Sequence, residues 1–230
     1  MKKVLTVAVF GDTSNLNPEL EEVEIIRADD AQLKKCKSKY TVFLNSGFTY
    51  CDLPPLLDSA ESASADILAF EGGCLFKTSQ IKQPDTNTDI FSLQINCILN
   101  CKSIERTLLA PFKLAEVIDC DSSAFERLKN TVKEYTSAKT KVPVEVYSYA
   151  RDLICERLVS VYKSYMLAIR NGADNNLLVE FDRDIKSYDM VLYKVFENRF
   201  NHAELEKLRA KNFKMSFITA IKYKKERKTK

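Results

Sequence analysis

The chain has 230 residues, of which 45% are hydrophobic and 29% are charged, so it can bury a sizeable core as one domain or as one domain with an appendage. The formal net charge of +3 is too small to indicate a nucleic-acid partner, and the positive charge gathers in the final segment KYKKERKTK. The sequence contains no apolar run of about 18 residues and no pattern of a cleavable leader, so we expect neither a membrane span nor secretion, and the default location is cytoplasmic.

Cysteine and histidine usage argues against a zinc site or a disulfide framework. The seven cysteines show no paired CxxC spacing, and the single histidine, His202, has no cysteine or aspartate at ligand spacing. We therefore expect reduced cysteines that act mostly as small buried hydrophobic residues, and a histidine at the surface.

The first third of the chain alternates predicted strands and helices. Buried strands are predicted at 3–10 (KVLTVAVF), 23–28 (VEIIRA), 40–44 (YTVFL) and 66–70 (DILAF), and the last of these turns through Gly72 and Gly73 into a further strand, CLFK. Between the third and fourth strands, residues 51–65 predict a helix with Asp52 as its cap and two prolines in its first turn. This is the pattern of an α/β fold.

The middle of the chain predicts two helices and one strand. Ile90, Leu93, Cys97 and Ile98 recur at helical spacing, and Ser123 with Glu126 has the form of a capping box at the start of another helix. Residues 141–147, KVPVEVY, alternate three valines, which predicts a half-buried strand.

From about residue 148 the pattern is helical throughout. One apolar stripe runs from Ala150 to Ile169 and stops at Asn171-Gly172, and a second runs from Leu177 to Phe196. A third helix is predicted to start at the Asn201-x-x-Glu204 box and to carry apolar residues as far as Ile221. The sequence therefore predicts an α/β domain over 1–147 and a helical region over 148–230.

Three segments carry a resemblance to a known family. VLTVAVF, VEIIRADDA and KSKYTVFLNSGFTYCDLPPLLDSAESASADILAF resemble the first strands and helix of the family 2 glycosyltransferases of the capsule- and teichoic-acid-type branch. VEVYSYARDLICERL is similar to the later strand of that family, so the resemblance covers roughly 3–160. It implies a GT-A-like, mainly parallel sheet flanked by helices, in a nucleotide-diphospho-sugar transferase domain, with an α-helical C-terminal subdomain.

The resemblance also implies roles for four aspartates. Asp29 and Asp30 stand where the family's second strand ends in a nucleotide-contacting Asp-Asp pair, although aspartates also favour plain strand-end turns. Asp119 and Asp121 lie where the acceptor-activating carboxylate would fall, with Asp121 the better candidate for the general base. The alternative for Asp121 is a helix N-terminal acid that interacts with the helix dipole.

The chain departs from the family at two places. Asn45, Ser46 and Gly47 stand where the family has its Asp-x-Asp metal motif, so this position is a degenerate one, or else a simple turn in which Gly47 supplies backbone freedom. A divalent cation bound to a diphosphate prefers carboxylate ligands, and one amide and one hydroxyl replace them poorly. In addition, residues 11–22 leave too little chain for the usual helix after the first strand.

Two functions of different class follow. The first is a degenerate, glycosyltransferase-like pseudoenzyme without metal-dependent transfer, which acts as a binding or assembly partner in surface polysaccharide biosynthesis. The alternative is an active transferase that moves a sugar from a nucleotide-sugar donor to a glycan acceptor, and only this alternative calls for Mn²⁺ or Mg²⁺ as a cofactor.

The C-terminal helices predict a partner of their own. They carry many aromatic residues, which are enriched in interface cores, so we expect a homodimer or a dimer with a related transferase. The alternative is a monomeric subdomain that closes over the sheet. These aromatic residues are Tyr162, Tyr165, Phe181, Tyr188, Tyr193, Phe196, Phe200, Phe213 and Phe217. The basic tail adds at most a peripheral contact with the inner face of a membrane, since each Lys or Arg near an anionic surface contributes about 1 kcal/mol.

Overall fold

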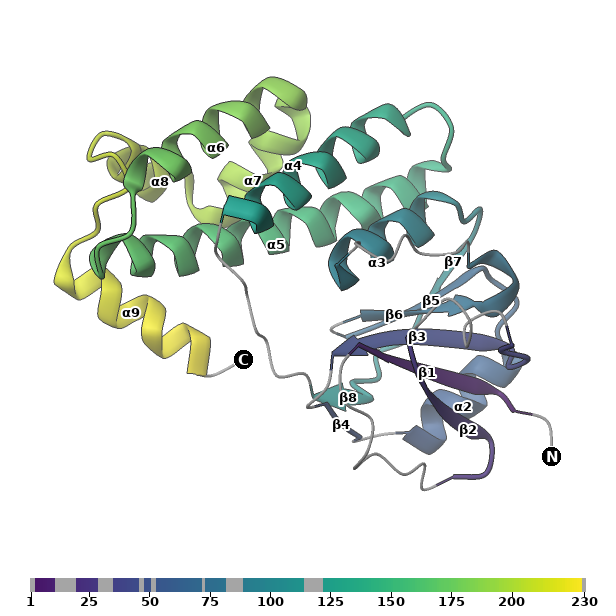
Figure 1. Cartoon of the computed structure of the whole chain (residues 1–230). Coiled ribbons are helices and arrows are strands. Elements are labelled where there is room, and N and C mark those ends of the chain that lie inside the picture. The colour runs from purple at the N-terminus through teal and green to yellow at the C-terminus, as the bar shows by residue number, and fades with distance from the viewer. Residues whose placement is uncertain are drawn as a thin grey trace. The chain divides into compact units, whose positions relative to one another are not determined.

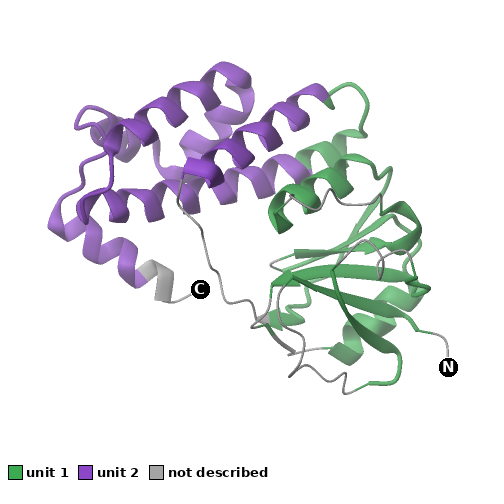
Figure 2. Cartoon of the chain, viewed as in Figure 1, with its two compact units in different colours: residues 1–116, 138–148 green, residues 117–137, 149–230 purple. Residues whose placement is uncertain are grey.

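The structure is a computed structural model that describes residues 3–10, 20–28, 35–45, 48–50, 53–71, 73–81, 89–113 and 122–228. It divides into two compact units, Met1–Glu116 with Ala138–Ser148 and Val117–Ser137 with Tyr149–Lys230 (Figure 2). The segment 117–137 thus belongs with the helices that follow residue 149. A separately folding domain over 1–147 stays a prediction.

The first unit is built on a six-stranded sheet of order β2-β1-β3-β6-β5-β7 (Figure 1). Its strands are β1 (Leu5–Phe10), β2 (Val23–Arg27), β3 (Tyr40–Asn45), β5 (Ile67–Phe70), β6 (Gly73–Lys77) and β7 (Ile104–Arg106). The pairs β1 with β2, β1 with β3 and β5 with β7 are parallel, whereas β6 runs antiparallel to β3 and β5. The predicted α/β fold with a mainly parallel sheet flanked by helices is confirmed.

Helices α2 (Leu53–Ser62) and α3 (Ile90–Leu99) lie on opposite faces of this sheet (Figure 1). Because strand residues alternate between faces, Leu5, Val7 and Val9 pack with Leu56 of α2 in one buried cluster. On the other face, the ring of Phe43 lies 5.8 Å from that of Phe76. The two faces are therefore both covered by apolar packing, as the continuous apolar runs of β1 and β3 predicted.

Hydroxyl groups join the strands near their amino ends. The Thr6 hydroxyl donates to Glu24 Oε1 at 2.5 Å and lies 2.6 Å from the Ser38 hydroxyl. Tyr40, the first residue of β3, donates its hydroxyl to the Ala65 carbonyl at 2.6 Å, and burial raises its pKa to about 12. These bonds satisfy polar groups that the sheet buries.

Short elements complete the first unit. The predicted hairpin is confirmed, because Phe70 pairs with Gly73 where β5 turns into β6. A 3-10 helix, Thr78–Gln80, follows β6, and Asp89 caps α3 by accepting from the amides of Phe91 and Ser92. Strands β4 (Thr49–Tyr50) and β8 (Phe112–Lys113) pair in a separate two-stranded sheet.

The second unit is helical and has an aromatic core. Its helices are α4 (Ser122–Ser137), most of α5 (Val144–Arg170), α6 (Asn175–Tyr188), α7 (Met190–Phe200), α8 (His202–Arg209) and α9 (Phe217–Lys228). Phe181 of α6 stacks on Phe125 of α4 at 4.5 Å, and Tyr162 of α5 lies 4.7 Å from Phe196 of α7. No helix in the described part of the chain is long and apolar enough to cross a membrane.

Most of the aromatic residues that suggested a dimer are used within this one chain. The buried ones are Tyr162, Tyr165, Phe181, Tyr193, Phe196, Phe200 and Phe213. A side chain that is already buried in its own unit cannot also form an interface core, so these residues no longer argue for self-association. The dimer itself stays a prediction.

The predicted strand at 141–147 is wrong, and so is the resemblance of VEVYSY to a later family strand. These residues lead into α5, which begins at Val144, and the Tyr147 amide donates to the Pro143 carbonyl at 2.9 Å. Proline before the first helical residue removes no helix bond, and Val144 is 80% exposed while Val146 is buried. Three alternating valines are too short a pattern to outweigh the helical sequence that follows.

Helix boundaries differ from the prediction at two more points. The expected helix over 177–196 is divided at Asp189, whose carboxylate accepts from the amides of Val191 and Leu192 and starts α7. The expected third helix is divided into α8 and α9 by residues 210–216. Its start is confirmed, because Asn201 accepts from the Glu204 amide, and the predicted stop of α5 is confirmed at Gly172, whose φ is +102°.

Candidate functional site

The carboxyl ends of β2, β1 and β3 form the candidate site. The chain passes from β1 to β2 on one side and then to β3 on the other side of β1, and all three strands run parallel. In open α/β sheets, ligands bind outside the carboxyl ends of the strands, at the point where successive strands are added on opposite sides of the first one. The described ends at this point are Phe10 of β1, which pairs in register with Asn45 of β3, and Arg27 of β2, which pairs with Val9.

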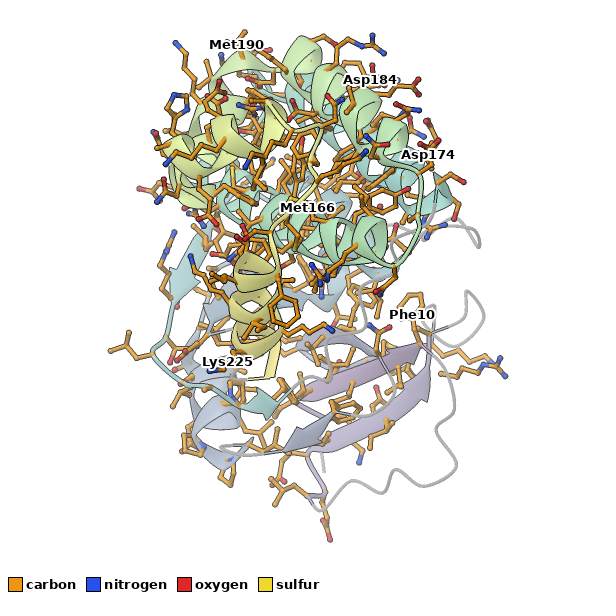
Figure 3. All side chains as sticks on the ribbon, turned by 90° about the vertical axis from the view of Figure 1, so that its left-hand side faces the viewer. Phe10, Met166, Asp174, Asp184, Met190 and Lys225 are labelled. Carbon is orange, nitrogen blue, oxygen red and sulfur yellow. The ribbon has the colours of Figure 1, made fainter. Side chains whose placement is uncertain are left out.

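The described side chains at this edge include two aromatic rings and a few polar groups. Phe10 lies at the end of β1 (Figure 3), with its ring 6.3 Å from that of Phe43 in an edge-to-face arrangement. Gln94 of α3 donates its amide to the Phe43 carbonyl at 3.2 Å, and Asn45 is exposed. The sequence pattern did not single out Phe10 or Gln94, because only the fold brings α3 beside β3.

The chain is held on both sides of the degenerate motif. Asn45 is paired in β3, and Phe48 is buried with its ring 6.1 Å from that of Phe112 in β8. Ser46 and Gly47 lie outside the described residues.

The other predicted site residues also lie outside the described part of the chain. Asp29 and Asp30 follow Ala28, whose amide donates to the Val9 carbonyl at 2.9 Å at the end of β2. Asp119 and Asp121 fall between β8 and α4. The roles of all four aspartates stay predictions.

The residues at the motif do not fit a divalent cation. Positions 45–47 offer a neutral amide from Asn45 and a hydroxyl from Ser46, but no carboxylate. Mg²⁺ and Mn²⁺ prefer carboxylate and phosphate oxygens, so this position alone does not supply the ligands that the family motif would.

A second polar cluster lies inside the helical unit, and the sequence did not predict it. Asp182 of α6 accepts hydrogen bonds at 2.7 Å from the hydroxyls of both Tyr162 and Tyr193, and it pairs with Arg209 Nε at 3.0 Å. Burial raises the pKa of Tyr193, and the neighbouring Asp182 carboxylate raises it further. Arg209 also pairs with Glu197 at 2.7 Å and with Glu206.

His202 joins the edge of this cluster. Its Nδ1 lies 3.7 Å from Glu197, and ligand atoms of Glu197, His202 and Glu206 all lie within 4.8 Å of one another. Arg209, however, already neutralises both glutamates and holds the pKa of Glu206 below its usual range. With His202 exposed, as predicted, the arrangement is that of a structural ion-pair network at a helix junction.

Comparisons with known proteins identify solved structures that have a similar fold. No protein-family model matches the sequence, and no curated protein matches it. Among solved structures, the chain is similar to S. aureus TarS 1-349 in complex with UDP, at 11% identity and a TM-score of 0.51, over 98% of this chain and 92% of that chain. The complex of TarS 1-349 with UDP-GlcNAc gives 9% identity and a TM-score of 0.51, over 87% of this chain and 92% of that chain.

A longer S. aureus TarS structure matches at 11% identity and a TM-score of 0.46, and it covers 86% of this chain. The chain spans only 55% of that structure's length. Identities this low carry information about the fold alone. The two structures with the higher score show that the chain shares the α/β fold of TarS 1-349, with its GT-A-like, mainly parallel sheet flanked by helices.

Proposed function

We propose that this chain binds a nucleotide sugar at the carboxyl edge of β2, β1 and β3 without a divalent cation, and acts as a binding or assembly partner in surface glycan synthesis. The observation that supports the proposal is the strand order, in which the chain goes from β1 to β2 on one side and then to β3 on the other side of β1. In open α/β sheets ligands bind at the carboxyl ends of the strands where the order reverses in this way, and Phe10 and Asn45 are the paired residues at those ends. The similar TarS structures contain UDP or UDP-GlcNAc, which supports this ligand class.

In this proposal Asp29 and Asp30 accept hydrogen bonds from the base or the ribose. They follow the end of β2 after Ala28, and carboxylates suit hydroxyl and N–H donors of a nucleoside. Asn45 replaces a metal-binding carboxylate with a neutral amide, so the donor diphosphate is not bridged by a cation at that position. The bound sugar then lacks the charge neutralisation that helps a diphosphate to leave, and transfer is lost while binding is kept.

Calorimetric titration with UDP-GlcNAc, UDP and GDP, each with and without Mn²⁺, tests this proposal. We expect binding of at least one nucleotide, with a Kd that Mn²⁺ does not change. Binding that appears only with Mn²⁺ would support the alternative, an active transferase in which Asp121 or Asp119 serves as the base toward a glycan acceptor. Absence of heat with every nucleotide would contradict both.

Placing carboxylates at positions 45 and 47 tests whether the chain fails to bind a divalent cation only because these ligands are absent. The double change Asn45→Asp and Gly47→Asp is expected to create Mn²⁺ affinity, because it supplies the two carboxylates of the family motif directly after β3. Gly47→Asn in the otherwise unchanged chain is the control, since it has the same shape and no charge. A folded double variant that binds Mn²⁺ no better than this control would show that more than the ligands has been lost.

A further inference from the structure

The last described helix, α9, presents an apolar strip to solvent. Phe217 is 64% exposed, Ile218 80% and Ile221 41%, whereas Ala220 and Tyr223 on the other side of the helix are buried. A helix of a globular unit normally turns its apolar residues inward. Here α9 is apolar on two sides, and only one of them is used by the fold.

The inward side holds α9 firmly on the helical unit. The Tyr223 ring lies 6.4 Å from Phe200 of α7, and its hydroxyl donates to Glu204 of α8 at 2.9 Å. Lys163 of α5 lies 5.0 Å from the same ring. Because Tyr223 fixes the rotation of α9 about its axis, the exposed strip has a defined direction.

Lysines flank this strip along its length. At about 100° per residue, Phe217, Ile221 and Ile218 fall within about 100° of the helix surface, with Lys224 on one side and Lys222 on the other. By the same spacing, Lys225 falls between the positions of the two isoleucines. Figure 3 shows Lys225 toward the C-terminal end of α9, and all three lysines are exposed. At the other end, the guanidinium of Arg170 lies 5.0 Å from the Phe217 ring.

We propose that α9 docks on an anionic membrane surface, with Phe217, Ile218 and Ile221 inserted among the lipid headgroups. A short apolar strip bordered by lysines is the arrangement of helices that lie in the plane of a bilayer interface, since long lysine side chains place their charge at the headgroups while the apolar residues enter below. This inference does not depend on nucleotide binding at the sheet.

The charges also favour a lipid surface over a second copy of the chain. Lys222 already pairs with Glu204 at 3.5 Å. A symmetric contact between two α9 strips would bring Lys224 and Lys225 of both copies together, and like charges oppose that contact. An anionic bilayer instead attracts every one of these lysines and accepts the apolar strip at the same time.

Co-sedimentation of the full chain with lipid vesicles tests the proposal. We expect binding to vesicles that contain about 30 mol% phosphatidylserine in phosphatidylcholine, weaker binding at high salt, and at least about tenfold weaker binding to pure phosphatidylcholine. Changing Phe217, Ile218 and Ile221 to serine should weaken binding at least about tenfold. Changing Lys224 and Lys225 to glutamine should remove most of the preference for anionic vesicles.

The control is Val144→Ser, at another exposed apolar position that belongs to α5. It should bind vesicles like the unchanged chain, and all variants should melt near the same temperature because the changed side chains are exposed. No binding to anionic vesicles, or binding that the triple serine variant keeps, would overturn the proposal. A dimer in light scattering that this variant converts to a monomer would assign the strip to self-association and overturn it as well.

Discussion

Replacing Phe181 by alanine is expected to lower the free energy of unfolding of the helical unit by about 3–5 kcal/mol. Phe181 is 1% exposed, it stacks on Phe125 with ring centroids 4.5 Å apart, and Tyr162 lies 5.8 Å away. The loss combines the free energy gained by burying the ring, which the variant lacks, with the cost of the cavity that remains. The free energy of unfolding of a native protein is about 5–15 kcal/mol in total, so this single change would remove a large part of it. Urea denaturation followed by circular dichroism measures it.

Phe217→Ala is the matched control, because this phenylalanine is 64% exposed in the same unit. Its effect should stay within about 0.5 kcal/mol. The loss caused by Phe181→Ala should also be the same at low and high protein concentration, since Phe181 is buried within one chain. A loss that grows as the protein is diluted would instead place Phe181 in a dimer interface and restore that prediction.

Replacing Arg209 by methionine is expected to cost about 3–5 kcal/mol. Arg209 pairs with Asp182 at 3.0 Å and with Glu197 at 2.7 Å, and the three side chains are only 13–18% exposed. Methionine keeps much of the volume but leaves two nearly buried carboxylates without their cation. Thermal unfolding of the variant and of the unchanged chain measures the loss.

Arg199→Met provides the comparison for Arg209. Arg199 also pairs with two carboxylates, Asp152 at 2.9 Å and Glu156 at 2.8 Å, but its side chain is 33% exposed and the side chain of Glu156 is 64% exposed. Solvent screens such pairs, so we expect less than about 1 kcal/mol. Equal losses for the two arginines would contradict the structural role of the Asp182 network.

The features that the sequence predicted correctly are those set by neighbours along the chain. Continuous apolar runs identified β1, β2 and β3, and paired glycines identified the turn between β5 and β6. Asn201 and Gly172 marked helix ends through their own backbone and side-chain chemistry. The exact strand order and the antiparallel insertion of β6 needed the structure, because pairing partners are distant in the sequence.

The errors arose where a local pattern had two meanings. Val142, Val144 and Val146 alternate like a strand, yet Pro143 is equally suited to precede a helix, and the long apolar stripe beyond it prevailed. The stripe through Ile185 and Leu192 continues across Asp189 in helical phase, so only the cap made by Asp189 divides it. The Asp182–Arg209 network joins residues 27 positions apart, which no spacing rule detects.

Hydrogen exchange of the full chain, with and without saturating UDP-GlcNAc, tests the central claim most directly. If the nucleotide sugar binds at the carboxyl edge of β2, β1 and β3, exchange should slow in peptides that contain Phe10, Ala28 and Asn45, with no added Mn²⁺, and should stay unchanged in α6, α7 and α8. Slower exchange confined to the helical unit, or no change anywhere at a concentration that gives calorimetric binding, would contradict the account.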